Sequence, residues 1–265
     1  MVQKHGIVPR AQAAPDHARV MHASQWPASR NMFSESGKHM EMSTSQPPAP
    51  PMVTAQALRF GQPGRLLWDG ASHAWPAGLC LVCGGEGSGK TSLLKALAGQ
   101  LPLQGGRLGY PHATQRPSLF WRDPRAGLES AESTRLVHDW VQAQRQLYPA
   151  WSELLWQTHA EGLGLAPHLH KPLLALSTGS LRKLWMAAGW ASGAALVLID
   201  EPLAALDRAS IGHVQHALAG LGWAGQQAAP VAGHGPRCVI VAHWDAMQGI
   251  AWDDVLELPQ QGPLR

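Results

Sequence analysis

A glycine-rich segment about a third of the way along the chain constrains its fold more than any other feature. It reads GGEGSGKTS, from Gly84 to Ser92, and lies between the apolar stretch AGLCLVC and the segment LLKALAGQL. Glycines suit a core segment poorly, but they let backbone N–H groups turn inward and approach a ligand without a Cβ clash. A helix that begins near Lys90 would point its positive end at an anion. The spacing Gly-x4-Gly-Lys-Thr therefore predicts a phosphate-binding loop between a strand and a helix.

The residue types in this loop predict how a triphosphate is held. Lys90 would supply charge to the β- and γ-phosphates, and the hydroxyl of Thr91 can ligate Mg²⁺. A glycine-rich turn without a ligand is the alternative, and the flanking strand and helix weigh against it. The residues expected to contact the phosphates are Gly84, Gly85, Glu86, Gly87, Ser88, Gly89, Lys90, Thr91 and Ser92.

A second feature is the segment ALVLIDEP, in which an apolar strand ends at Asp200 and Glu201. A carboxylate at the carboxyl end of a central strand can hold a metal ion directly or through water. By this reasoning Asp200 holds the metal, and Glu201 is placed to polarise an attacking water. An Asp-Glu pair after a strand is by itself usually a solvated strand end. The phosphate loop upstream makes the pair specific.

The remaining patterns predict an α/β fold. The unbroken apolar runs 195–199 and 238–242 suit parallel strands that are buried on both faces. Further strands are expected at VTAQALRF, GLCLVC and PSLFW, and helices over 91–100 and about 127–175. Strands that alternate with helices favour a mostly parallel central sheet with helices on both sides.

The N-terminal 51 residues differ from the rest of the chain. They are rich in Ser, Pro, His, Met and Gln, and no helical or strand period persists in them. They are predicted to be disordered, or to be an over-extended gene start with Met52 as the true first residue. Residues 52–265 are predicted to form the globular domain.

Composition narrows the expected partners and compartment. The net charge is only +3 and no long Lys/Arg run occurs, so direct contact with nucleic acid is not expected. The longest run of apolar and small residues, 186–199, is too short and too mixed to span a bilayer. The N-terminus lacks the apolar region of a secretory signal, which makes the cytosol the expected compartment. Cys80 and Cys83 could bind metal, but positions i and i+3 of a strand face opposite sides, and no second pair completes a zinc set.

Three further segments complete an ordered series along the chain. LSTGS (176–180) precedes a helix with an apolar face, LAALD (203–207) follows Glu201, and His243 follows the run VIVA. Together with the phosphate loop and ALVLIDEP, this series resembles the ATP-binding cassette (ABC) family over about residues 52–258. The resemblance implies a P-loop NTPase with a mostly parallel central sheet, an antiparallel β region and an inserted helical subdomain at about 127–180.

The resemblance also implies a dimer in which two nucleotide domains meet head to tail, with ATP and Mg²⁺ between them. Ser177 and the N–H of Gly179, in the segment called the signature, would contact the γ-phosphate bound to the partner subunit. Glu201 would be the general base, and His243 would hold the γ-phosphate and the attacking water. The remaining family roles fall on Thr91 and Asp200 as ligands of Mg²⁺, Asp207 of the D-loop as a nucleotide-site residue, and Phe60 as the aromatic that stacks on adenine.

The partners implied are a second nucleotide-binding domain, in a homo- or heterodimer, and a separate membrane permease. The chain would then lie on the cytoplasmic face of the inner or plasma membrane as a peripheral protein that powers transport. One alternative is a soluble ABC ATPase that acts as a switch on a protein or nucleic-acid partner. A phosphate-loop kinase and a cassette that binds ATP but hardly hydrolyses it are the others.

The sequence departs from the family pattern in two places. Thr178 and Ser180 replace the usual first glycine and the glutamine of the signature, whereas Gly179 is kept. The loop after PSLFW, where the family has a glutamine that helps hold Mg²⁺, has Arg122 at the aligned position, and Gln115 lies seven residues too early. In the helical stretch, Trp140, Trp151 and Trp156 could form a docking surface for the permease, although burial preference favours a place in the core.

Overall fold

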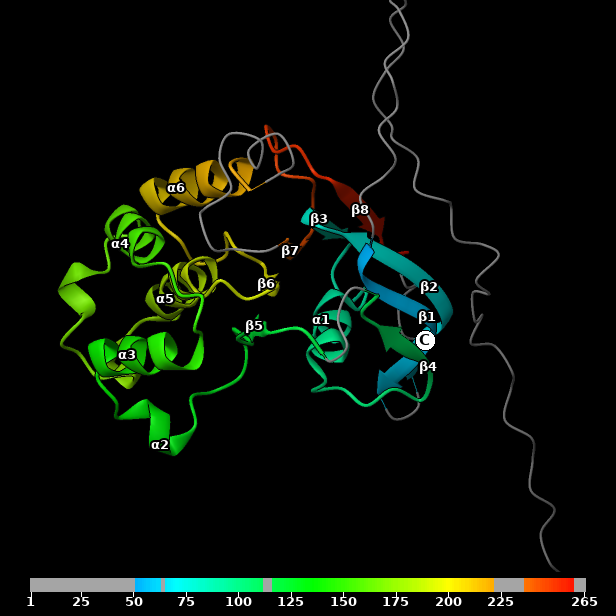
Figure 1. Ribbon diagram of the computed structural model, residues 1–265, viewed down its shortest axis with the longest axis horizontal. Helices are drawn as coiled ribbons and strands as arrows, with labels where there is room; N and C mark the ends of the chain where they lie inside the picture. Colours follow the sequence, from blue (N-terminus) through cyan, green and yellow to red (C-terminus); the bar gives the residue numbers. More distant parts are fainter. Residues whose placement is uncertain (1–50, 63–64, 112–115, 222–235, 260–265) are drawn as a thin grey trace, which may run out of the picture.

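The computed structural model describes residues 51–62, 65–111, 116–221 and 236–259 (Figure 1). Residues 1–50 of the proposed N-terminal extension, Gln115 and the segment 222–235 lie outside the described residues.

A parallel five-stranded sheet forms the centre of the molecule, in the strand order β5-β6-β7-β3-β8. Long apolar runs build its inner strands, because both of their faces are covered. The predicted strands at 195–199 and 238–242 are therefore confirmed as neighbours. The strands are β3 (Gly78–Cys83), β5 (Leu119–Trp121), β6 (Leu196–Asp200), β7 (Cys238–His243) and β8 (Asp254–Glu257).

Side chains of β6 alternate between two hydrophobic cores, one on each face of this sheet. Leu196 and Leu198 face the core that contains α1 (Lys90–Ala98), whereas Val197 and Ile199 face the core of the longer helices. This period of two follows from strand geometry. The parallel sheet therefore fixes the ends of β3, β6 and β7 between two packed layers.

A second, antiparallel sheet has the strand order β2-β1-β4 and lies next to α1, on the side away from β5 and the helical end. Its register is irregular on β1, with shifts near Leu58 and between Phe60 and Gly61. Such bulges re-aim the side chains that follow them. Its strands are β1 (Pro51–Gln62), β2 (Arg65–Pro76) and β4 (Gly105–Gly109).

Helices fill the chain between β5 and β6 and form one end of the molecule (Figure 1). Trp140 and Trp156 are buried in the core of this region, and Trp151 packs against it partly exposed. The core interpretation of Trp140 and Trp156 is therefore correct. The elements are α2 (Ser130–Ser133), α3 (Val137–Leu147), α4 (Glu153–Gly162), the 3₁₀ turns η2 (Ala166–His168) and η3 (Leu173–Ala175), and α5 (Thr178–Ala191).

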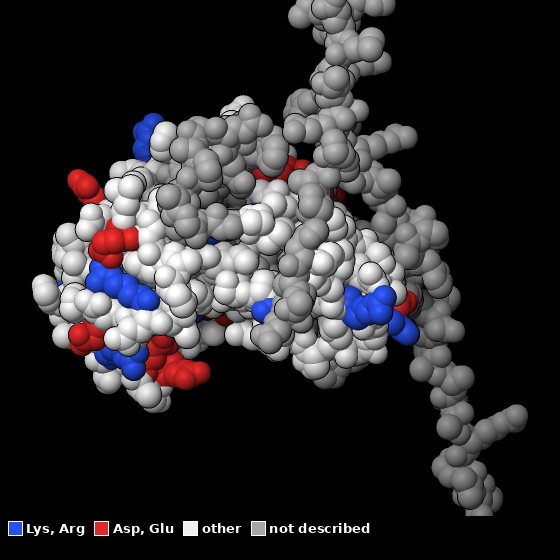
Figure 2. Space-filling model, viewed as in Figure 1, with Lys and Arg blue, Asp and Glu red and all other residues white. Residues whose placement is uncertain are grey.

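After β6 the chain forms α6 (Arg208–Ala219), which lies beside α4. Among the described residues, no helix combines the length and apolarity that crossing a bilayer requires. On the face in Figure 2, Lys, Arg, Asp and Glu side chains of the described residues lie close together over the helical end.

Candidate active site

The glycine-rich segment connects β3 to α1, as predicted. Gly87 and Gly89 have φ angles of 71° and 98°, which side chains with a Cβ rarely adopt. Gly89 is the N-cap of α1, and no side chain caps the N–H groups of the first turn. An uncapped helix N-terminus favours an anion. The loop therefore has the backbone geometry of a phosphate cradle.

Lys90 is buried and folds back over this loop. Its Nζ donates to the carbonyl oxygens of Gly84 at 2.7 Å and Gly85 at 3.1 Å. The same Nζ lies 3.6 Å from Oε1 of Glu201. The ammonium group is thus held at the mouth of the loop, where it can reach the oxygens of a bound phosphate.

Thr91 and Asp200 meet at the base of the loop. The Thr91 hydroxyl donates to Oδ2 of Asp200 at 2.8 Å. Burial raises the pKa of Asp200, although the Thr91 hydrogen bond and the charge of Arg125 act in the opposite direction. Within the described residues, Oδ1 of Asp200 and Oγ of Ser88 are buried without a hydrogen-bond partner.

Unpaired buried oxygens are costly, and a cation is one ligand that would satisfy them. A hydroxyl beside a carboxylate is a donor set that Mg²⁺ accepts. The residues present, Thr91 and Asp200, therefore fit the metal that the sequence implied.

Glu201 lies between Lys90 and His243. Its backbone N–H donates to the carbonyl of Ala242 on the neighbouring strand β7 at 2.8 Å. Its Oε2 lies 3.9 Å from Nε2 of His243. Glu201 also has a φ of 48°, a left-handed conformation that is strained for a residue with a side chain. The sheet therefore holds this carboxylate in a fixed position beside a lysine and a histidine.

His243 is oriented by the turn that follows it. Its Nδ1 lies 3.0 Å from Oδ1 of Asp245 and 3.1 Å from the carbonyl of Asp245. The backbone N–H of Asp245 also lies 3.3 Å from Nδ1, so this turn holds the ring by one nitrogen while Nε2 faces Glu201. Asp245 is thus a positioning residue that sequence reasoning passed over.

Lys90, Thr91 and Glu201 line one cavity of about 550 Å³, a size typical of small-molecule sites, and Asp200 and His243 are not among its lining residues. Three of its lining residues were missed by the sequence analysis, namely Leu67 of β2, Arg125 and Trp244. Trp244 could have been noticed because it follows His243 directly, and Arg125 because it is basic and lies in the loop after β5. The cavity is lined by Leu67, Glu86, Gly87, Ser88, Gly89, Lys90, Thr91, Ser92, Arg125, Glu201 and Trp244.

The signature lies at the start of α5, outside this cavity. Ser177 is the N-cap, and its Oγ accepts from the N–H of Ser180 at 3.1 Å. Asp207 caps α6 by accepting from the N–H of Ser210 at 2.9 Å and also pairs with Lys183 of α5. Lys183 and these hydrogen bonds hold the pKa of Asp207 well below its ordinary value. The phosphate cavity described above is not lined by Ser177, Gly179 or Asp207 of the same chain.

Phe60 does not lie where the adenine contact was expected. Its ring is fully buried in the core and stacks on Trp68 with a centroid separation of 5.4 Å. The irregular register of β1 turns this side chain inward. The structure therefore does not present Phe60 for an adenine contact, and Leu67 and Trp244 are apolar side chains that line the cavity.

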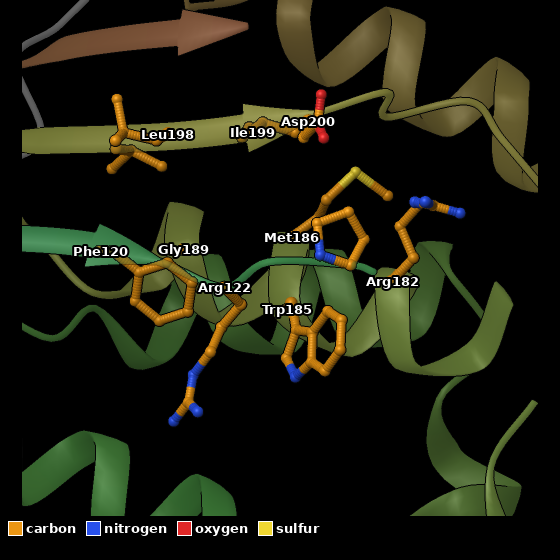
Figure 3. Close-up of a pocket in the computed structure, with 11 residues that line it drawn as sticks. Phe120, Arg122, Arg182, Trp185, Met186, Gly189, Leu198, Ile199 and Asp200 are labelled. Atoms are coloured by element: carbon orange, nitrogen blue, oxygen red, sulfur yellow. The ribbon is translucent and has the colours of Figure 1, made fainter. Parts of the chain in front are cut away.

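Arg122 also points elsewhere. In Figure 3 its guanidinium extends away from Asp200. It pairs with Glu132 of α2, with Nη2 3.0 Å from Oε1, and lies 5.3 Å from the ring centre of Trp140. Arg122 thus contacts the helical region through Glu132 and Trp140 and does not take the place of the family glutamine at the metal site. The small hollow in Figure 3, between β5, β6 and α5, is separate from the phosphate cavity.

Comparisons with known proteins identify the family of the chain. The family model described as ABC transporter matches residues 73–204. The cytochrome c biogenesis ATP-binding export protein CcmA of Pseudomonas fluorescens is 31% identical over 178 residues, which cover 64% of this chain and 83% of that protein. The protein of the same name from Pseudomonas savastanoi pv. phaseolicola is 32% identical over 181 residues, which cover 65% and 84%.

Solved structures match the fold. An ABC transporter ATP-binding protein of Pyrococcus furiosus aligns with a TM-score of 0.60 at 18% identity, over 78% of this chain and 96% of that one. The loop, the buried Asp200 and the adjacent Glu201 define a P-loop ATPase. The chain belongs to the ABC transporter family as an ATP-binding subunit. It is thus an ATP hydrolase coupled to transport.

Proposed function

We propose that this chain hydrolyses ATP at Glu201 to power an export step of cytochrome c biogenesis through a separate membrane permease. The hydrolytic part of this proposal rests on one observation: Lys90, Thr91 and Glu201 line the same cavity, and Thr91 donates a hydrogen bond to the buried Asp200. The export step rests on the related proteins CcmA, whose name describes an ATP-binding export protein of cytochrome c biogenesis.

In this mechanism the phosphate loop and the first turn of α1 bind the α- and β-phosphates through backbone N–H groups. Lys90 leaves the carbonyls of Gly84 and Gly85 and turns to the β- and γ-phosphates. Thr91 and Asp200 hold Mg²⁺, which neutralises charge on the phosphates when bound. Catalysis is then mostly a matter of positioning and charge stabilisation.

Glu201 accepts a proton from the attacking water as general base. Its carboxylate oxygens lie 3.6 Å from Nζ of Lys90 and 3.9 Å from Nε2 of His243. His243, oriented by Asp245, directs Nε2 at the water and the γ-phosphate. The strained backbone at Glu201 keeps the carboxylate aimed at this position.

The active form is proposed to be a dimer, because Ser177, Gly179 and Asp207 lie outside the cavity of their own chain. Ser177 and the Gly179 N–H at the N-terminus of α5 would then contact the γ-phosphate bound by the partner subunit. ATP binding would close the dimer, hydrolysis would open it, and the permease would follow this motion from the cytoplasmic face of the membrane.

The hydrolytic part is tested by measuring phosphate release from the purified chain with Mg·ATP over a series of protein concentrations. The specific rate is expected to rise with protein concentration. Glu201→Gln is expected to lower the rate by at least about 100-fold, because the amide cannot take the proton, while ATP binding persists. Equal rates for the two proteins would show that Glu201 is not the base.

The export part is tested in the host cell by deleting the gene and restoring it as wild type or as Glu201→Gln. Covalently bound haem in c-type cytochromes is expected to return only with the wild-type chain. If cytochromes mature normally without the gene, this ATPase serves a different transport step. A soluble switch is not favoured, because the relatives above 30% identity carry the name of an ATP-binding export protein.

A further inference from the structure

The loop after β5 is tied to α1 and brings a second cation to the phosphate cavity. Asp123 anchors this loop: its Oδ2 lies 2.7 Å from Nζ of Lys95 on α1, and its side chain is only 7% exposed. The other carboxylate oxygen, Oδ1, accepts from the backbone N–H of Arg125 at 2.9 Å. The turn closes with the N–H of Ala126 donating to the carbonyl of Asp123 at 3.2 Å. The backbone at Arg125 is therefore fixed relative to the phosphate loop.

The side chain of Arg125 is exposed at the edge of the phosphate cavity. It lines the cavity with Lys90, Thr91 and Glu201, and its guanidinium forms no hydrogen bond or ion pair with a described residue. The other arginines near the site are engaged: Arg122 pairs with Glu132, and Arg182 donates to the carbonyl of Ala204 at 2.7 Å. An unpaired arginine held at the edge of a phosphate cavity has the donors for a phosphate and lacks an internal acceptor.

The position of Arg125 selects one end of the triphosphate. The loop backbone and α1 would approach the α- and β-phosphates, whereas Arg125 comes from the loop after β5 and lines the same cavity as Glu201. Glu201 marks the end of the cavity at which the attacking water would lie. A guanidinium there faces the oxygens of the terminal phosphate.

We propose that Arg125 donates hydrogen bonds to the γ-phosphate of ATP bound in the same chain and so distinguishes ATP from ADP. This inference rests on the proposed ATPase function. A planar guanidinium suits two oxygens of one phosphate, and charge-assisted bonds of this kind are the stronger ones. Because the family pattern places a neutral glutamine in this loop, Arg125 gives this chain a contact that the resemblance does not supply.

The test compares the affinities for Mg·ADP and for a non-hydrolysable ATP analogue, measured by titration calorimetry on full-length wild type, Arg125→Ala and Arg125→Lys. Arg125→Ala is expected to weaken binding of the ATP analogue about 10- to 100-fold, and to change ADP binding less than about twofold. Arg125→Lys retains the positive charge but lacks the two parallel N–H donors of a guanidinium, and it is expected to recover part of the lost affinity for the ATP analogue. The matched control is Arg135→Ala, which removes the same charge from an exposed residue outside the cavity.

Each outcome decides the proposal. Selective loss of affinity for the ATP analogue in Arg125→Ala, with Arg135→Ala unchanged, supports it. Unchanged affinity for the analogue overturns it, and so does an equal loss for both nucleotides, because a contact to the γ-phosphate cannot affect ADP. If the wild-type chain binds neither nucleotide, the proposed ATPase function fails, and this inference fails with it.

Discussion

The backbone carbonyl of Ala205 occupies the space that a side chain on residue 179 would need. A Cβ on Gly179 would overlap the Ala205 oxygen, so the start of α5 and the D-loop touch backbone to backbone. Ala205 itself has a φ of 61°, and Arg182 of the same helix donates to the neighbouring carbonyl of Ala204 at 2.7 Å. The signature glycine therefore has a packing role within one chain, in addition to the contact proposed across the dimer.

Gly179→Ala is expected to destabilise the fold by about 1–3 kcal/mol, because the added methyl group forces the D-loop outward. Thermal unfolding of the nucleotide-free protein measures this. Gly212→Ala is the matched control: Gly212 lies in α6, and nothing occupies the space around its missing Cβ. That substitution is expected to stabilise by about 0.5–1 kcal/mol, as alanine does in a helix. Similar effects of the two changes would contradict the contact.

Asp200→Asn is expected to abolish hydrolysis and yet to raise the stability of the nucleotide-free protein. Burial raises the pKa of Asp200, so the ionised carboxylate costs folding energy above the ordinary carboxyl pKa, and that cost is relieved as pH falls through the raised value. The amide removes the buried charge and is expected to add about 1 kcal/mol at pH 7. Urea unfolding at pH 7 with EDTA measures this, and lower stability of the variant would refute the argument.

The sequence predicts the phosphate site well because most of it is local. Lys90 and Thr91 directly follow a loop whose glycines are needed for its turns. Asp200 ends a strand whose apolar run places it inside the sheet, and Glu201 follows it. The position of a residue at the end of such a strand can be predicted from the local sequence, without knowing which distant segments it contacts. The strand-helix-strand order therefore indicates both the fold and the residues that meet at its edge.

Side-chain direction beyond regular elements is harder to predict. Phe60 lies between register shifts on β1, and a slip of one residue sends a strand side chain to the opposite face. Arg122 and Arg125 lie three residues apart, and contacts with other segments hold them differently: Arg122 pairs with Glu132, whereas the ion pair of Asp123 with Lys95 holds the turn that presents Arg125 to the cavity. Such choices depend on contacts between segments that a pattern along one segment does not contain.

Arg122→Gln tests whether this position takes the role of the family glutamine. The side chain of Arg122 pairs with Glu132 and points away from Asp200 in Figure 3. Restoring glutamine is therefore expected to leave the ATPase rate within about twofold of wild type. It is also expected to lower stability by about 1 kcal/mol, because the ion pair and the contact with Trp140 are lost from a partly exposed site. A large gain in rate would mean that the loop rearranges and that position 122 reaches the metal.

A pair of histidines links the helical end to the remainder of the molecule and predicts a pH dependence. Nδ1 of His159 on α4 lies 3.1 Å from Nε2 of His213 on α6, and the His159 ring packs on Trp190. Burial, with a smaller contribution from the charge of His213, lowers the pKa of His159 to about 4. The unfolded chain therefore binds this proton more readily than the folded chain. The contribution of His159 to the free energy of unfolding is therefore fully present above about pH 6.5 and is lost as the pH falls toward 4.

The expected loss over this pH interval is about 2–3 kcal/mol, measured by urea unfolding at several pH values. His159→Gln keeps a hydrogen-bonding group for His213 but cannot titrate, so its stability is expected to depend less on pH between 6.5 and 4. His138→Gln is the control, because the His138 side chain is 53% exposed, and it is expected to follow the wild-type curve. If His159→Gln keeps the full wild-type slope, the acid sensitivity arises from other groups and the α4–α6 histidine pair does not control it.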